Sequence, residues 1–225
     1  NTGGIYGHEK ILDYKDELYT HVYTNSRLMK EKFHNLGVPV DNYEWFLNCL
    51  SEDEMIYDTK YAHDCVFLGM GFGRVSKPEY QLERDLFFSG FNGDIDFNLY
   101  GNGWPEYEFY RGILPPQDIG RLYSSAKSGF ALIAKGQREI GMINNRYSEM
   151  GSCGIPIISY NYEDIDWYGA KEFINFVSTK QEAIDTVNDI LSDNEKYKKQ
   201  TEKLKEFTKN QHTVFFEKLF NLMEQ

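Results

Sequence analysis

The chain of 225 residues is 41% hydrophobic, which suffices for one large domain or for one domain with part of a second. Its net charge of −11 repels phosphate backbones and argues against nonspecific binding to nucleic acids. Three widely spaced cysteines favour a reducing compartment, and no apolar run approaches the roughly 18 residues of a membrane-spanning helix. We therefore expect a cytoplasmic protein.

Strand-like and helix-like patterns alternate along most of the chain. Short apolar runs predict strands at 19–24, 64–68, 96–100, 129–134, 155–160 and 173–177. Amphipathic stretches bounded by capping residues, proline or glycine predict helices at 26–36, 78–88, 116–126, 180–192, 194–209 and 211–224, with a short one starting at residue 145. This order predicts an α/β fold: a Rossmann-like parallel sheet with helices on both faces, followed by C-terminal helices.

The segment 145–159, NRYSEMGSCGIPIIS, is the most informative of the chain. Arg146 and Glu149 are three residues apart and share one face of the expected short helix. Gly151 and Gly154 allow a tight turn and a close approach, and a buried strand follows. A carboxylate there can accept two hydrogen bonds from a ribose diol, while the arginine orients it or contacts phosphate. We interpret the segment as a candidate nucleotide or sugar site; the alternative is a surface ion pair on an ordinary helix.

A glycine-rich loop follows the second expected strand. Gly69, Gly71 and Gly73 let a backbone approach closely, and such a loop can wrap a diphosphate with its N–H groups. Arg74 and Lys77 could then neutralise phosphate oxygens. The spacing of the glycines differs from the dinucleotide-binding pattern, and a tight strand-to-helix turn is an equal alternative.

Two further loops follow predicted elements. The strand at 96–100 ends in Gly101, where glycine permits a ligand or another loop to sit on the strand end, and Trp104 comes soon after. Ile113 lies in a loop before a proline-capped helix, and the backbone of that loop could hydrogen-bond a base edge. The alternative for the first loop is a turn with a core tryptophan, and the alternative for the second is an ordinary connection between two elements.

Metal-dependent sugar transferases use Asp-x-Asp pairs, and the chain has two, at 94–96 and 164–166. The first precedes an expected strand and the second follows one. Both are explained by the acidic composition, and the five histidines show no paired ligand spacing. We assign no metal site.

Taken in order, these pieces resemble the C-terminal, donor-binding domain of a GT-B glycosyltransferase of the CgeB-like or group 1 type. The resemblance covers about residues 60–225 and rests on VFLGMGFGR, LYGNGW, RGILPPQDIGRLYSSAKSGFALI, NRYSEMGSCGIPIIS and NQHTVFFEKLF. It implies transfer of a sugar from a nucleoside diphosphate sugar to an unknown acceptor. UDP is the nucleotide that the family commonly uses. No metal and no cofactor besides that substrate is implied.

The resemblance also implies a set of donor-binding residues: Gly69, Gly71, Gly73, Arg74, Lys77, Gly101, Trp104, Ile113, Arg146 and Glu149. Glu149 would bind the ribose, and Arg146 would support Glu149 or the phosphates. Arg74 and Lys77 would meet the diphosphate beside the glycines, and Ile113 would contact the base. Gly101 and Trp104 would line the pocket.

We expect residues 1–60 to be the end of an N-terminal, acceptor-side domain and residues 61–225 to form the nucleotide-sugar-binding domain. An inverting enzyme of this type takes its base from the N-terminal half, so no catalytic residue is assigned. A missing N-terminal domain or a partner chain would supply that half. Two alternatives stay open: a nucleotide-sugar-binding or scaffold module without turnover and, more weakly, a phage-type transferase that modifies DNA bases.

Overall fold

The computed structural model describes residues 49–71, 93–104, 107–133, 143–160 and 171–224, short pieces between 22 and 42, and positions 88, 91 and 138. A sheet of five parallel strands, in the order β4-β3-β5-β6-β7, organises the described part of the chain. The strands are β3 (Cys65–Leu68), β4 (Phe97–Tyr100), β5 (Gly129–Phe130), β6 (Ile157–Tyr160) and β7 (Ile174–Val177). Strands expected from sequence periodicity are thus confirmed, although β5 is shorter than the predicted 129–134.

The main helices are α5 (Ile119–Ser125), α7 (Asn145–Cys153), α8 (Lys180–Ser192) and α9 (Asn194–Met223). Short 3-10 turns are η1 (Thr59–Tyr61), η2 (Pro116–Asp118) and η4 (Lys171–Phe173). The predicted division into helices 194–209 and 211–224 is wrong, because α9 is one continuous helix of 30 residues. Neither glycine nor proline interrupts it there, so nothing in the backbone stops the helix. The predicted helix 78–88 lies almost wholly outside the described residues.

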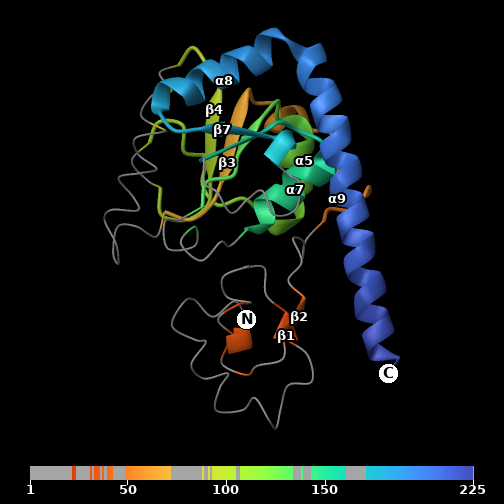
Figure 1. The fold of residues 1–225 in the computed structure, drawn as a ribbon. Coiled ribbons are helices and arrows are strands. Elements are labelled where there is room, and N and C mark those ends of the chain that lie inside the picture. Colours follow the sequence, from red (N-terminus) through yellow and green to blue (C-terminus); the bar gives the residue numbers. More distant parts are fainter. Residues whose placement is uncertain are drawn as a thin grey trace.

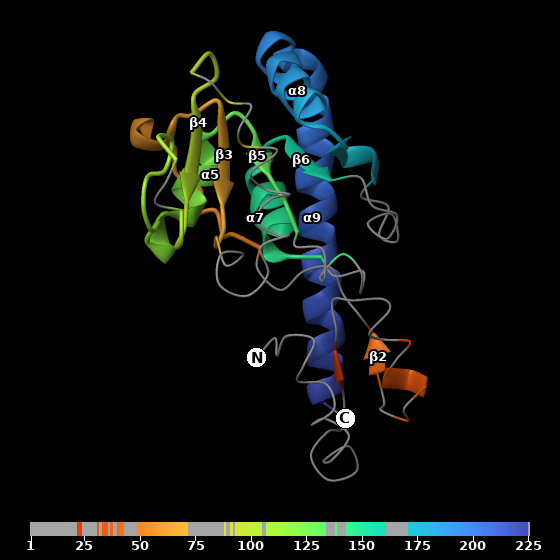
Figure 2. The ribbon, with the colours of Figure 1, turned by 90° about the vertical axis from the view of Figure 1, so that its left-hand side faces the viewer.

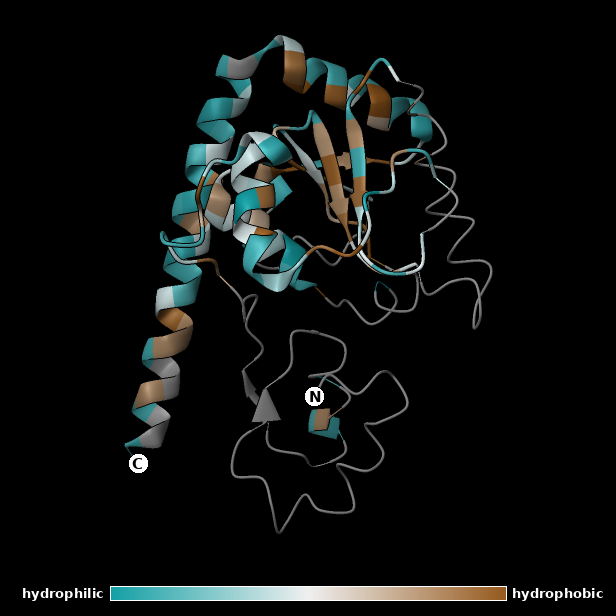
Figure 3. Cartoon of the chain, turned by 180° about the vertical axis from the view of Figure 1, so that it is seen from behind, coloured by the Kyte–Doolittle hydropathy of each residue, from teal (hydrophilic) through white to brown (hydrophobic). Residues whose placement is uncertain are grey.

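Helices cover both faces of the sheet, as predicted (Figures 1 and 2). Alternate strand residues point to opposite faces and build two apolar cores. On one face Val66 packs with Met150 of α7 and Leu204 of α9. On the other face Phe67 belongs to a core that includes Val187 of α8. Figure 3 shows the strands mostly in the brown of apolar residues, as strands covered on both sides require.

The order of the strands fixes where a ligand site is expected. From β3 the chain moves outward to β4, then returns past β3 to β5 and continues to β6 and β7. The strand order therefore reverses between β3 and β5. In open parallel sheets, ligands bind outside the carboxyl ends of the strands at this switch point.

A separate small sheet pairs β1 (Val22–Tyr23) in parallel with β2 (Val40–Asn42). Residues 31 and 33–35 are helical, and Gly37 ends this piece with a positive φ of 74°. These pieces agree with the strand and helix expected at 19–36. The division into domains at residues 60 and 61 stays a prediction.

Gly151 and Gly154 have different functions in the fold. Gly154 caps α7 in the left-handed conformation, with φ 69°. Gly151 lies inside α7, where a Cβ would overlap the Thr208 hydroxyl on α9. The long helix therefore rests against α7 at a glycine and then runs on beyond the sheet (Figures 1 and 2).

We expect Gly151→Ala to lower the free energy of unfolding by about 1–3 kcal/mol, because the added methyl group pushes α9 away from α7. Alanine is the better helix former by up to about 1 kcal/mol, so any loss measures overpacking. The side-chain oxygen of Thr208 is buried and has no hydrogen-bond partner in the described part of the chain. Thr208→Ala in the same chain should therefore recover part of the loss. Urea unfolding of the two single variants and the double variant checks this, and a Gly151→Ala variant as stable as the parent would contradict it.

Candidate functional site

Two glycine loops meet at the carboxyl edge of the sheet. The Gly69 amide donates to the Tyr100 carbonyl at 2.9 Å, and the Gly71 amide donates to the Asn102 carbonyl at 2.8 Å. Gly101 has φ 127°, and a Cβ on it would overlap the carbonyl oxygen of Gly69. Glycine is thus required at Gly101 because one loop sits on the other, which was one of the two sequence-based interpretations of this position.

Trp104 lies beneath these loops rather than on an open surface. Its side chain is 1% exposed, and its Nε1 donates to the Gly69 carbonyl at 2.8 Å. The ring packs edge-on against Phe67, with centroids 6.0 Å apart. The structure therefore gives Trp104 a supporting contact under the first loop, and its predicted place in the pocket lining stays a prediction.

Ile113 lies in a loop at the same edge. Its side chain is 70% exposed. The neighbouring Gly112 carbonyl accepts the Gly101 amide at 2.9 Å, which ties this loop to the end of β4. The predicted Gly73, Arg74 and Lys77 lie outside the described residues.

Arg146 bridges the switch point. It stands in the first turn of α7, where the side chain of Asn144 caps the helix by accepting the Arg146 amide. The Arg146 Nε donates to the Leu68 carbonyl at the end of β3, and Nη1 donates to the Leu132 carbonyl beyond β5 at 3.1 Å. The guanidinium also lies 5.1 Å from the centre of the Phe67 ring. Arg146 therefore joins the two strand ends between which the order reverses.

Glu149 lies one turn further along α7 and is 9% exposed. Burial raises the pKa of its carboxyl to about 7, against the opposing effect of the positive charge on Arg146. No hydrogen bond to its carboxylate is found among the described residues. The alternative interpretation, an ion pair on the protein surface, is wrong because Glu149 is buried. A buried carboxyl with a raised pKa and no fixed partner is a typical mark of a functional position.

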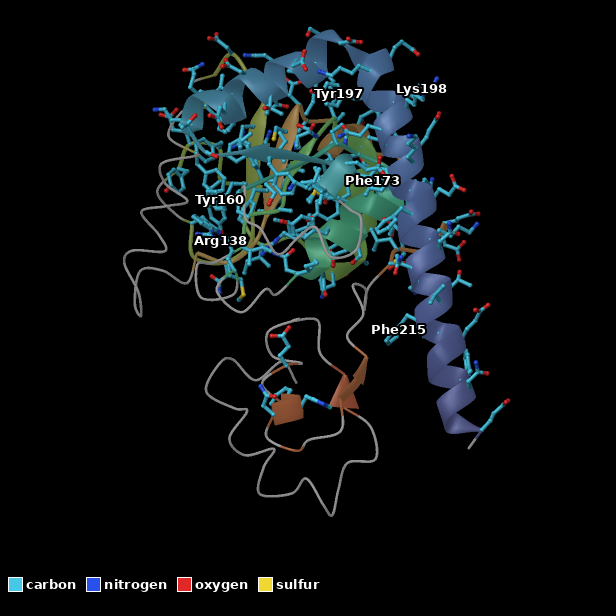
Figure 4. The ribbon with its side chains drawn as sticks, viewed as in Figure 1. Arg138, Tyr160, Phe173, Tyr197, Lys198 and Phe215 are labelled. Atoms are coloured by element: carbon cyan, nitrogen blue, oxygen red, sulfur yellow. The ribbon has the colours of Figure 1, made fainter. Side chains whose placement is uncertain are left out.

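Two other residues at this site were missed by sequence reasoning. Arg138 donates to the Ile133 carbonyl at 2.6 Å and lies 4.6 Å from the centre of the Tyr160 ring, at the carboxyl end of β6 (Figure 4). Tyr123 of α5 is fully buried, and its hydroxyl has no hydrogen-bond partner among the residues that the structure describes. In the sequence, Tyr123 has the spacing of an ordinary core residue, and Arg138 stands in no recognisable motif.

A surface hollow of about 590 Å³ lies elsewhere, between β7, α8 and the start of α9. It is lined by Asn175, Phe176, Glu182, Asp185, Thr186, Asp189 and Tyr197. Its carboxylates are already engaged: Glu182 accepts the Ser178 amide. Asp189 accepts Lys196 and Tyr197. The hollow therefore offers no free recognition group comparable to Glu149.

Within the described ranges, no group of three histidine, cysteine, aspartate or glutamate side chains could hold a metal ion. Of the two Asp-x-Asp pairs, the first lies at the amino end of β4, where Asp96 bonds His63 at 2.9 Å. The second, at 164–166, is outside the described residues. No helix in the described part of the chain is both long and apolar enough to cross a membrane.

Fold and site together define the class: a Rossmann-like domain of the GT-B type, with its candidate site at the carboxyl edge of a parallel sheet. The chain belongs to the glycosyl transferase-like family, whose model matches residues 84–215. The resemblance seen in the sequence is thereby confirmed. None of the curated protein sequences matches the chain.

Solved glycosyltransferases share this fold. Alr3699/HepE of Anabaena, in complex with UDP-glucose, aligns with a TM-score of 0.63 and 13% identity over 96% of this chain and 67% of its own. T4 phage BGT with its UDP-glucose substrate aligns with a TM-score of 0.58 and 16% sequence identity, over 84% of this chain and 58% of its own. Sucrose-phosphate synthase of Thermosynechococcus elongatus aligns with a TM-score of 0.57 and 14% sequence identity, over 95% of this chain and 62% of its own. The chain spans about half to two thirds of such structures, and at these identities the likeness concerns the fold alone.

Proposed function

We propose that this chain is the donor-binding half of a glycosyltransferase that moves a sugar from a UDP-linked donor to an acceptor still to be identified. The proposal rests on Glu149, a buried carboxyl that has no hydrogen-bond partner among the described residues and lies one helical turn from Arg146 at the switch point of the sheet. A carboxylate in this position can accept both hydroxyls of a ribose diol. The UDP-glucose bound to similar folds supports the choice of donor.

The diphosphate would lie over the start of α7 and the glycine loops. Backbone N–H groups and the positive end of a helix favour a negative charge there. Arg74 and Lys77 would add positive charge, and Ile113 would lie beside the base. Charge on the leaving diphosphate would be stabilised by these groups without a metal ion. An acceptor half would come from a further domain or a partner chain; the GtfA/B complex is one assembly that contains a similar fold.

Two alternatives are kept, each with a distinct expectation. A binding or scaffold module would take up the nucleotide sugar and show no turnover, even with the acceptor half present. A transferase acting on DNA bases is the weaker alternative left open by the sequence, and the net charge of −11 argues against it.

Calorimetric titration with UDP, GDP and UDP-glucose tests the proposal. We expect micromolar binding of UDP and UDP-glucose, weaker binding of GDP, and at least a tenfold loss in Glu149→Gln, because a hydrogen bond to a charged group contributes about 1.5–3 kcal/mol. Glu195→Gln, an exposed change of the same charge on α9, serves as the matched control. Failure of all three nucleotides to bind would contradict the proposal.

A further inference from the structure

Tyr123 carries a hydroxyl whose burial is not compensated. The residue lies on α5, which packs against α7, and its side chain is 0% exposed. The hydroxyl has no hydrogen-bond partner within the part of the chain that the structure describes. Leaving a buried hydroxyl unpaired is unfavourable, and phenylalanine would fill the same space without that loss of hydrogen bonding. A retained hydroxyl of this kind calls for an explanation beyond packing.

The charged groups near this hydroxyl suggest what it serves. Burial raises the pKa of Tyr123 well above its usual range; the negative charge of Glu149 raises it further, and the positive charge of Arg146 opposes this. Arg146 already donates to two backbone carbonyls and has no capacity to accept a hydrogen bond. The ionised carboxylate of Glu149 has no proton to donate and acts purely as a hydrogen-bond acceptor, whereas a tyrosine hydroxyl can donate. The two groups without partners on α5 and α7 are therefore chemically matched.

We propose that Tyr123 is a positioning residue for Glu149: its hydroxyl donates to the ionised carboxylate when a nucleotide sugar is bound, and so fixes the orientation in which Glu149 receives the ribose diol. The inference rests on the proposed function. In the free protein the Tyr123 hydroxyl has no hydrogen-bond partner among the described residues, and burial raises the pKa of the Glu149 carboxyl to about 7. Binding of the diol favours the ionised form of Glu149, and this carboxylate then accepts a hydrogen bond from the Tyr123 hydroxyl.

The groups that face Glu149 allow its titration to be isolated. Among the described residues they are Arg146 and Cys153 on α7 and Tyr123 on α5, with Lys205 and Glu54 acting on Cys153. Burial raises the pKa of Cys153 to about 11, and the pKa of Tyr123 lies above its usual range as well. Between pH 6 and 8 Glu149 is thus the member of this group that changes charge. UDP-glucose is the probe of choice because, unlike UDP, it has no terminal phosphate that titrates in this range.

The experiment measures the Kd for UDP-glucose from pH 5.5 to 8.5 in the parent chain, Tyr123→Phe and Glu149→Gln, together with thermal unfolding. In the parent, affinity should rise as Glu149 ionises. Tyr123→Phe should weaken binding about tenfold at pH 8, shift the midpoint of this rise to higher pH, and leave the Tm equal or higher. Glu149→Gln should bind with little pH dependence.

A purely structural hydroxyl would change the Tm of Tyr123→Phe and leave both the affinity and the midpoint unmoved, which would overturn the inference while the proposed function stands. Parent chain that binds no UDP-glucose at any pH would overturn both.

Discussion

Gly101→Ala should destabilise the protein by about 3 kcal/mol or more, the largest loss that we expect from any single methyl group in this chain. The new Cβ would overlap the backbone carbonyl of Gly69, and neither loop can give way because their hydrogen bonds cross between them. The backbone at Gly101 also has φ 127°, which an L-residue with a side chain rarely adopts. Chemical denaturation followed by tryptophan fluorescence would measure the loss, since Trp104 lies directly under these loops.

Gly93→Ala is the matched control for this variant. Gly93 has a comparable φ of 98°, but a Cβ there meets nothing within 4 Å. Its replacement should therefore cost only the backbone strain, about 1–2 kcal/mol. The difference between the two variants isolates the contact between the loops. Equal losses at both positions would show that backbone strain alone explains the effect and that the loops can separate.

Glu149→Gln should abolish a specific pH dependence of stability. The pKa of Glu149 is raised from its usual 4.5 to about 7 in the folded chain. The folded protein therefore holds this proton over a range in which the unfolded chain has released it. The stabilising contribution of Glu149 is complete below about pH 4.5 and is lost as the pH rises to about 7. The loss amounts to roughly 3 kcal/mol by pH 8, since one pKa unit corresponds to about 1.4 kcal/mol.

The difference between the free energies of unfolding of Glu149→Gln and the parent should accordingly grow in favour of the variant between pH 4.5 and 8. Urea unfolding at intervals of half a pH unit would give both curves, and Glu195→Gln again controls for the change in net charge. Parallel curves across this range would mean that Glu149 titrates normally and reaches water. Glu149 would then lack the burial on which the candidate site depends.

The parallel sheet could be predicted because each strand is an apolar run bounded by turn residues. Val66, Ile157 and Val177 stand in such runs, and burial on both faces leaves no other role for them. The end of α7 was also predictable, because Gly154 adopts the conformation that glycine favours at a helix end. The continuous α9 was not predicted: the expected helices 194–209 and 211–224 are one helix, because every residue at 209–211 tolerates a helical conformation.

The candidate site was predictable in its location but not in its contacts. The spacing of Arg146 and Glu149 placed both on one helix face, and they lie there in the structure. Arg146 donates to a carbonyl at the end of β3 and to one just beyond β5. These two carbonyls are neighbours because of the order of the strands, which no local pattern encodes. The glycines of the two loops approach each other for the same reason. The unpaired hydroxyl of Tyr123 depends on the packing of α5 against α7, so its spacing alone reveals only a core residue.

The uninterrupted α9 has a mechanical consequence. Thirty residues of α-helix span about 45 Å, and the contacts to the core described above come from Leu204 and Thr208 in the first half. A helix without a break transmits rotation along its whole length, so a tilt of about 5° at Gly151 would move the far end by roughly 2 Å. A domain or partner attached to that end would be displaced with it, and the contact between Gly151 and Thr208 would be the pivot of the movement.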